Sequence, residues 1–199
     1  RTWLEQHGHR CRTTSDTEVL LRLYEAQGEQ CVEALDGMFA FAIWDARTER
    51  LLLARDRVGK KPLFYARTST SFLFASEIKA LLQHPDLVPE VNRESLEAFF
   101  LFGYVPTPET LYYGVQSVPP GHCARVASDG QVQMAGYWDL PVAASAPRIR
   151  QSPQEMRSTV RELVTAAVRK RLIADVPLGA FLSGGIDSSI IVGIMSRLM

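Results

Sequence analysis

Short apolar runs separated by turn residues fill the first two-thirds of the chain, a pattern typical of a β-rich domain. Met-Phe-Ala-Phe-Ala-Ile-Trp (residues 38–44) and Arg-Leu-Leu-Leu-Ala-Arg (residues 50–55) flank a short turn. They predict a hairpin whose strands are apolar on both faces, as in a sheet held between two layers. Ser128-Asp129-Gly130 is a turn signal between two later runs. The predicted strands are residues 38–44, 50–55, 63–66 and 72–75, with two more inside residues 118–138.

Helical patterns connect these strands. Asp16-Thr17-Glu18 stands ahead of a periodic apolar run, and Gly28 follows it, so a capped helix with a glycine stop is predicted. Ser76 is expected to cap a second helix, which ends before Pro85. The other predicted segments are a short helix over residues 29–35, a helix over residues 94–102 that ends at Gly103, and a proline- and glycine-rich surface segment over residues 105–121.

The pattern changes after residue 140. Residues 141–153 lose their periodicity and gather alanine, serine and proline, as linkers do. Ser152, Pro153 and Glu155 then form the signature of a capping box ahead of a long amphipathic helix. We therefore expect a first domain over residues 1–140, a linker over residues 141–152 and a second domain over residues 153–199.

A motif near the end of the chain carries the candidate chemistry. Residues 176–182 have the length of a strand, residues 190–195 predict a buried helix, and Ser-Gly-Gly-Ile-Asp-Ser-Ser (residues 183–189) stands between them. The glycines allow a tight turn close to a ligand, and the free N–H groups at the helix start favour an anion. Asp187 adds an oxygen ligand for Mg²⁺, and the serines add hydroxyl donors. The sequence therefore predicts a polyphosphate site.

Two better-known phosphate loops are excluded. The spacing G-x-x-x-x-G-K-[ST] does not occur, and neither does G-x-G-x-x-G. The alternative that needs no ligand is a tight strand-to-helix connection. One capping side chain satisfies such a connection, whereas this loop has an aspartate and three serines.

Composition narrows the class of protein. Lys plus Arg equal Asp plus Glu at 22 each in 199 residues, so no basic excess points to a nucleic-acid partner. No apolar run reaches the length of a membrane span, and no signal peptide is recognisable. Cys11, Cys31 and Cys123 form no zinc pattern with His7 and His9, which we expect to lie in an exposed turn. We expect a cytoplasmic protein with reduced thiols and no membrane partner.

The glycine–serine loop resembles the PP-loop of the ATP pyrophosphatases, in which S-G-G-x-D-S binds the pyrophosphate part of ATP. The resemblance implies that Asp187 holds Mg²⁺–pyrophosphate. GMP synthetases, NAD synthetases, argininosuccinate synthetases and tRNA-thiolating enzymes share the motif, so it does not select one reaction. The implied ATP-binding residues are Leu182, Ser183, Gly184, Gly185, Ile186, Asp187 and Ser188.

The first domain resembles the glutaminase domain of glutamine-hydrolysing asparagine synthetases. Six blocks occur in the family's order and lead to the PP-loop, so the resemblance covers nearly the whole chain. The blocks are residues 14–20 (Thr-Ser-Asp-Thr-Glu-Val-Leu), 35–45, 55–65, 75–81, 118–122 (Val-Pro-Pro-Gly-His) and 174–179 (Ala-Asp-Val-Pro-Leu-Gly).

This resemblance implies an α+β glutaminase sandwich of the N-terminal-nucleophile (Ntn) type, followed by the start of an α/β parallel-sheet PP-loop domain. Glutamine would supply ammonia, ATP would activate aspartate, and asparagine, glutamate, AMP and pyrophosphate would leave. Asp16 matches the aspartate that holds the α-amino group of glutamine, and helix N-capping is its structural alternative. The family's nucleophile is an N-terminal cysteine, which Arg1 does not provide. We therefore expect an internal fragment, without a glutaminase catalytic residue and inactive alone.

Several alternatives stay open. The amide acceptor could be that of an exopolysaccharide or secondary-metabolite amidotransferase, or the enzyme could resemble a β-lactam synthetase. A non-catalytic binding module is a different class, which the intact motif disfavours, and a homodimer is also open. Arg55, Asp56 and Gly59 are interpreted as structural residues of a charged strand end and its turn. Glu77 and Lys79 are interpreted as an exposed helix face.

Overall fold

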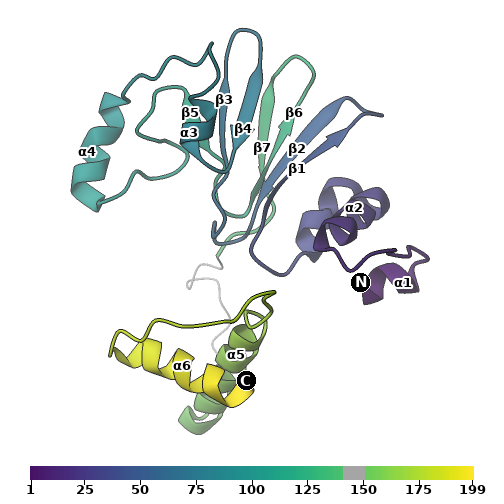
Figure 1. The fold of residues 1–199 in the computed structure, drawn as a ribbon, viewed down its shortest axis with the longest axis vertical. Helices are drawn as coiled ribbons and strands as arrows, with labels where there is room; N and C mark the ends of the chain where they lie inside the picture. Colours follow the sequence, from purple (N-terminus) through teal and green to yellow (C-terminus); the bar gives the residue numbers. More distant parts are fainter. Residues whose placement is uncertain (141–150) are drawn as a thin grey trace. The chain divides into compact units, whose positions relative to one another are not determined.

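A computed structural model describes residues 1–140 and 151–199 of the chain (Figure 1). The chain divides into two compact units, Arg1–Leu140 and Pro141–Met199. Residues 141–150 of the predicted linker lie outside the described residues.

The first unit is built on a four-stranded antiparallel sheet. Its order is β1 (Ala40–Asp45), β2 (Arg50–Arg55), β6 (His122–Val126) and β7 (Val132–Gly136). The β1–β2 hairpin and the β6–β7 hairpin were both predicted from their apolar runs and turns, and they pair as expected. The two hairpins join through β2 and β6, where Leu53 lies opposite Ala124.

A second, three-stranded antiparallel sheet has the order β4 (Phe72–Ala75), β3 (Phe64–Arg67) and β5 (Val115–Ser117). The β3–β4 pair was predicted, but β5 corrects the prediction that residues 105–121 only wind over the surface. Val115 and Ser117 are buried, at 1% and 3% exposure. A three-residue strand is too short to show a period of two, and its pairing with β3 joins positions about fifty residues apart.

The described helices of the first unit correct two predicted caps. The α2 cap is Ser15, whose hydroxyl accepts a hydrogen bond from the Thr17 N–H, so Asp16 is the first helical residue and not the cap. The α3 cap is Glu77, with no side-chain cap bond, and not Ser76. The helices are α1 (Thr2–Gln6), α2 (Asp16–Gln27), the 3-10 helix η1 (Gly28–Ala34), α3 (Ile78–Leu81) and α4 (Arg93–Phe102).

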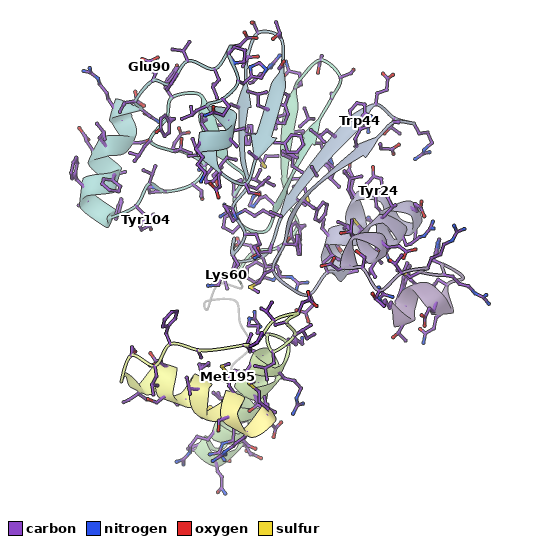
Figure 2. The ribbon with its side chains drawn as sticks, viewed as in Figure 1. Tyr24, Trp44, Lys60, Glu90, Tyr104 and Met195 are labelled. Atoms are coloured by element: carbon purple, nitrogen blue, oxygen red, sulfur yellow. The ribbon has the colours of Figure 1, made fainter. Side chains whose placement is uncertain are left out.

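The four-stranded sheet is covered on both faces at its centre. Leu52 and Ala54 of β2 pack in a cluster with residues of α1, α2 and η1, which lie beside β1 and β2 in Figure 1. Leu53 points the other way, into a cluster that includes residues of the second sheet. The prediction of strands apolar on both faces therefore holds for β2. It is wrong for the edge strand β1, where Trp44 is 58% exposed (Figure 2).

Helix α4 ends in an exposed apolar turn. Asn92 caps its start by accepting a hydrogen bond from the Ser95 N–H, and Gly103 ends it in the left-handed conformation, as the glycine predicted. Phe100 is 81% exposed, and Tyr104, which follows the helix, is 62% exposed (Figure 2).

The second unit contains α5 (Pro153–Arg169) and α6 (Ile186–Leu198), which pack against each other. The capping box at Ser152 is confirmed. The strand predicted over residues 176–182 is not formed, and Phe181 is fully exposed. The described part of this unit offers no strand for it to pair with, and an unpaired strand leaves its backbone groups unsatisfied. For the same reason α6, predicted to be buried, has no buried residue.

Among the described residues, no helix combines the length and the apolarity that a membrane crossing requires.

Candidate functional site

The loop at residues 183–189 keeps its turn through Gly184 and its own hydroxyl groups. Gly184 has a φ of 80°, which side chains other than glycine disfavour. The Ser183 and Ser188 hydroxyl oxygens are 2.8 Å apart. The Ser188 and Ser189 hydroxyls donate to the Gly185 carbonyl at 3.0 and 2.8 Å. The loop therefore holds a compact turn through hydrogen bonds among its own residues.

The start of α6 is open to a ligand. Gly185 is its N-cap, and it has no side chain that could bond to the first N–H groups. Ile186 and Asp187 are exposed in the first turn, so backbone donors and the positive end of the helix dipole face solvent. This arrangement can bind a phosphate group, in keeping with the predicted polyphosphate site.

The described residues offer few side-chain ligands for the predicted Mg²⁺ ion. The described residues contain no group of three or more His, Cys, Asp or Glu side chains able to hold an ion. Asp187 is the single carboxylate of the loop. Mg²⁺ commonly binds one or two carboxylates together with substrate phosphates and water, so Asp187 fits such an ion only when a phosphate ligand is also bound.

Asp16 lies in a second exposed site, at the start of α2. Its carboxylate has one long contact, 3.5 Å from the Thr17 hydroxyl. The neighbouring Glu18 accepts hydrogen bonds from the Arg12 N–H at 2.8 Å and from the Thr13 N–H and hydroxyl at 2.6 Å. These bonds lower the pKa of Glu18 to about 2. The residue-level predictions missed Glu18, although the S-x-x-E spacing after Ser15 was a signal for it.

Asp56 holds the turn between β2 and β3. It is 1% exposed. Burial alone would raise the pKa of Asp56, but four backbone N–H groups outweigh burial and lower that pKa. The turn thus folds around one buried carboxylate. The donors are Phe39 and Val58 at 3.3 Å and Lys60 and Lys61 at 2.9 Å.

Arg55 fastens the same turn from its other side. Its guanidinium donates to the carbonyls of Gly59 and Val118 and to the Ser117 hydroxyl, at 2.8–2.9 Å. A Cβ at Gly59 would lie 2.9 Å from the Pro120 side chain. Arg55, Asp56 and Gly59 are therefore occupied in structure, as their turn pattern predicted.

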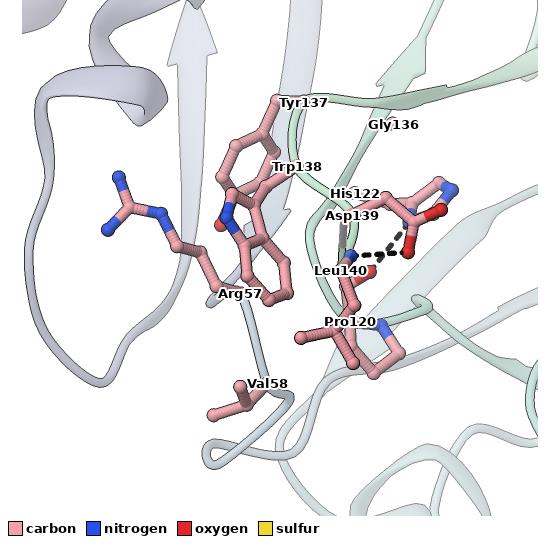
Figure 3. A pocket seen from close by; sticks show the side chains of 9 residues that line it. All are labelled: Arg57, Val58, Pro120, His122, Gly136, Tyr137, Trp138, Asp139 and Leu140. Atoms are coloured by element: carbon pink, nitrogen blue, oxygen red, sulfur yellow. Dashed lines mark hydrogen bonds between the residues drawn. The ribbon is translucent and has the colours of Figure 1, made fainter. Parts of the chain in front are cut away.

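A cavity of about 670 Å³ opens beside this turn (Figure 3). A Cβ at Gly121 would lie 2.4 Å from the carbonyl oxygen of Trp138, so Gly121 allows the close approach of Trp138, which lines the cavity. His122 donates from Nδ1 to the Pro120 carbonyl at 2.7 Å. In Figure 3 the Arg57 guanidinium points away from Pro120, so the polar groups do not converge on one point. No sequence motif predicted this cavity, because segments far apart in the chain form its lining.

Two of the three cysteines offer no activated thiol. Cys31 and Cys123 lie buried in the same core cluster. Burial raises the pKa of Cys31 to about 11 and that of Cys123 to about 12, so both stay protonated near neutral pH.

Residues 1–138 match the family model of the glutamine amidotransferase domain, and residues 159–199 match that of asparagine synthase. The glutamine-hydrolysing asparagine synthetase 3 of Bacillus subtilis (strain 168) is 42% identical over 195 residues. Those residues cover 98% of this chain and 31% of that protein. A putative glutamine-hydrolysing asparagine synthetase of Mycobacterium tuberculosis (strain ATCC 25618 / H37Rv) is 37% identical, over 96% of this chain and 30% of its own length. The chain thus spans about a third of the length of these curated relatives.

Among solved structures, the glutamine phosphoribosylpyrophosphate amidotransferase of B. subtilis, complexed with ADP and GMP, aligns with a TM-score of 0.45 at 18% identity. The alignment covers 99% of this chain and 41% of that one. The sequence match to the amidotransferase model takes in more than half of the chain. The chain therefore belongs to the family of glutamine amidotransferase domains.

Proposed function

We propose that this chain is part of a glutamine-hydrolysing asparagine synthetase. One observation carries the proposal: a glutamine amidotransferase domain is followed, in the same chain, by an asparagine synthase match that contains the Ser-Gly-Gly-Ile-Asp-Ser-Ser loop. The first supplies ammonia from glutamine, and the second activates the acid that ammonia attacks. The substrates of the longer protein would be glutamine, ATP and aspartate. The first unit would have the Ntn type of fold, and the second would begin a PP-loop domain.

The loop would bind the pyrophosphate part of ATP. The first N–H groups of α6 lie in an exposed turn and would donate to phosphate oxygens. The Ser183 hydroxyl, 2.8 Å from the Ser188 hydroxyl, would exchange that contact for a phosphate oxygen. Asp187 would hold a Mg²⁺ ion that neutralises phosphate charge. Adenylation gives the aspartate side chain a good leaving group, which a free carboxylate lacks, so that ammonia can form the amide. The remaining proposed ATP-binding residues are Leu182, Gly184, Gly185 and Ile186.

Asp16 would hold the α-amino group of glutamine. Its carboxylate is exposed and nearly unshared, while its neighbours Ser15 and Glu18 are occupied in hydrogen bonds. A carboxylate is the natural partner of an ammonium group. Neither Cys31 nor Cys123 is proposed as the nucleophile, because both thiols are buried and stay protonated.

The test uses the longer protein that contains this chain. It should catalyse exchange of pyrophosphate into ATP when aspartate is present, and it should release glutamate from glutamine. Asp187→Asn should lower the exchange rate by about 100-fold, since loss of a metal ligand removes several kcal/mol of charge stabilisation. Glutamate release should be unchanged. Glu162→Gln, on the exposed surface of α5, is the matched control. If aspartate supports no exchange, the assignment of asparagine as the product fails.

A further inference from the structure

The same capping signature occurs twice in this chain, with different outcomes. Ser152 and Glu155 form a reciprocal capping box, in which the Ser152 N–H donates to Glu155 at 2.7 Å and the Glu155 N–H donates back to Ser152 at 3.3 Å. Ser15 and Glu18 have the same S-x-x-E spacing at the start of α2. There the glutamate does not bond to the cap residue. It reaches back to residues 12 and 13 instead.

The cap N–H at Ser15 is satisfied by another group. It donates to the Thr13 hydroxyl at 3.2 Å, and that hydroxyl donates in turn to Glu18 at 2.6 Å. Glu18 also accepts from the Arg12 and Thr13 N–H groups. The carboxylate therefore closes the turn at residues 12–15, ahead of the helix, which capping alone does not require.

A third group ties the same turn from outside. The Arg1 guanidinium donates to the carbonyls of Thr13 and Ser15 at 2.8 and 3.0 Å. Within the described structure the polar atoms on both sides of Asp16 are thus bonded, while its carboxylate is exposed and makes only the 3.5 Å contact with Thr17. A fixed backbone that carries one unshared carboxylate suits the binding of an ammonium group. Because the carboxylate is already held in place, binding loses less free energy to ordering the protein.

We infer that Glu18 is a positioning residue for glutamine: it fixes the turn at residues 12–15 so that Asp16 presents its carboxylate to the substrate α-amino group. The inference rests on the proposed function, because it takes glutamine as the ligand of Asp16. It adds a residue that the family resemblance did not supply. Glu18 touches no substrate and acts only through the turn.

The ionisation of the Glu18 carboxylate supports this positioning role. Hydrogen bonds from Arg12 and Thr13 lower the pKa of Glu18 to about 2, and the Arg22 charge adds to the effect. The Glu18 carboxylate therefore stays ionised over the whole range in which such an enzyme is assayed. An effect of removing its charge should be the same at pH 6 and at pH 8.

The experiment measures steady-state kinetics of glutamine-dependent and ammonia-dependent product formation by the longer protein. Glu18→Gln should raise the KM for glutamine about tenfold and leave kcat within about twofold, because the chemistry is untouched and only substrate positioning is weakened. The ammonia-dependent rate should be unchanged. Glu155→Gln removes the same kind of glutamate from the other capping box, and it should leave the KM for glutamine unaltered.

A pair of substitutions at Thr13 tests the hydrogen bonds that link Ser15, the Thr13 hydroxyl and Glu18, and it leaves the Glu18 charge in place. Thr13→Val keeps the shape but loses the hydroxyl, and it should raise the KM for glutamine severalfold, whereas Thr13→Ser should behave as the native protein. This pair decides the question if Glu18→Gln does not fold. Equal KM values for the two Thr13 variants would overturn the inference.

A double substitution distinguishes a positioning role of Glu18 from a general effect of Glu18 on the stability of the fold. If Glu18 acts through Asp16, Glu18→Gln should add little to the rise in KM caused by Asp16→Asn, because the coupled residues share one effect. Fully multiplicative effects, or an unchanged KM in Glu18→Gln, would contradict the inference. If the native longer protein releases no glutamate at all, the proposed function fails instead, and the two failures are distinguishable.

Discussion

Replacing the buried Asp56 carboxylate should strongly destabilise the first unit. Asp56→Asn preserves its shape and replaces one oxygen by an NH₂ donor. One oxygen accepts from the Phe39 and Lys61 N–H groups, and the other accepts from Val58 and Lys60. Whichever oxygen is replaced, two backbone donors then face a donor in a site that is 1% exposed.

The magnitude follows from these two losses. Hydrogen bonds to a charged group contribute about 1.5–3 kcal/mol each, so losing two of them should lower the free energy of unfolding by about 3–6 kcal/mol. That is a large part of the roughly 5–15 kcal/mol that stabilises a whole domain. At about 3 °C per kcal/mol for a unit of this size, the melting temperature should fall by about 10–20 °C.

The sign of the pH dependence is fixed by the lowered pKa of Asp56. Its contribution is fully present above the ordinary pKa of 3.8, and it is lost as the pH falls through the lower pKa of the folded state. The difference in stability between the native chain and Asp56→Asn should therefore be complete at pH 7 and should shrink below pH 3.8.

Urea unfolding followed by tryptophan fluorescence and circular dichroism measures this difference. The matched control is Asp129→Asn, in the exposed β6–β7 turn, where one oxygen accepts a single bond from the Gln131 N–H at 2.9 Å. The control should lose at most about 1 kcal/mol. A loss in Asp56→Asn no larger than that of the control would refute the reasoning that the turn is built on this carboxylate.

Two further outcomes can be checked on the same chain. Gly121→Ala combines a φ of 66° with a Cβ only 2.4 Å from the Trp138 carbonyl oxygen, so it should lose about 2–4 kcal/mol in urea unfolding. Gly8→Ala has similar backbone strain but no atom within 4 Å, and it should lose about 1 kcal/mol; equal losses would contradict the clash. Burial raises the pKa of Cys31 to about 11 and that of Cys123 to about 12. A thiol reagent at pH 8 should therefore modify one of the three cysteines in the folded chain and all three in urea. Rapid modification of all three without urea would contradict the burial of Cys31 and Cys123.

The strands that could be predicted are those whose evidence is local. Residues 50–55 and 72–75 were predicted with the bounds of β2 and β4, because each is an apolar run next to its own turn. β5 carries no such signal. It is three residues long and pairs with β3, so only the folded chain shows that Val115 is buried.

In the second unit, by contrast, a local pattern predicted a strand that is not formed. Residues 176–182 have the composition of a buried strand, yet Phe181 is fully exposed in the structure. The local pattern states what a segment can become when a partner strand is beside it. The described part of the unit offers none, so the strand and the burial of α6 both failed as predictions.

In the candidate sites, too, only the features that consecutive residues form could be predicted. Asp16 and the loop at residues 183–189 could be proposed from the sequence, because each stands in a motif of consecutive positions. The Asp56 carboxylate was read as a turn residue, but its bond to Phe39 spans seventeen residues and could not be inferred from spacing. The cavity beside Trp138 was missed entirely, since its lining comes from three separate segments.

The two S-x-x-E motifs show what additional signal a sequence can hold. In both, the cap N–H must find an acceptor, because an orphaned donor at a helix start is unfavourable. Ser152 has no hydroxyl residue two positions before it, so its N–H takes Glu155 as the acceptor. Ser15 has Thr13 at that position, whose hydroxyl accepts the bond and frees Glu18 to close the turn. The longer pattern T-x-S-x-x-E therefore predicts a glutamate that shapes the preceding loop, where S-x-x-E alone predicts only a cap.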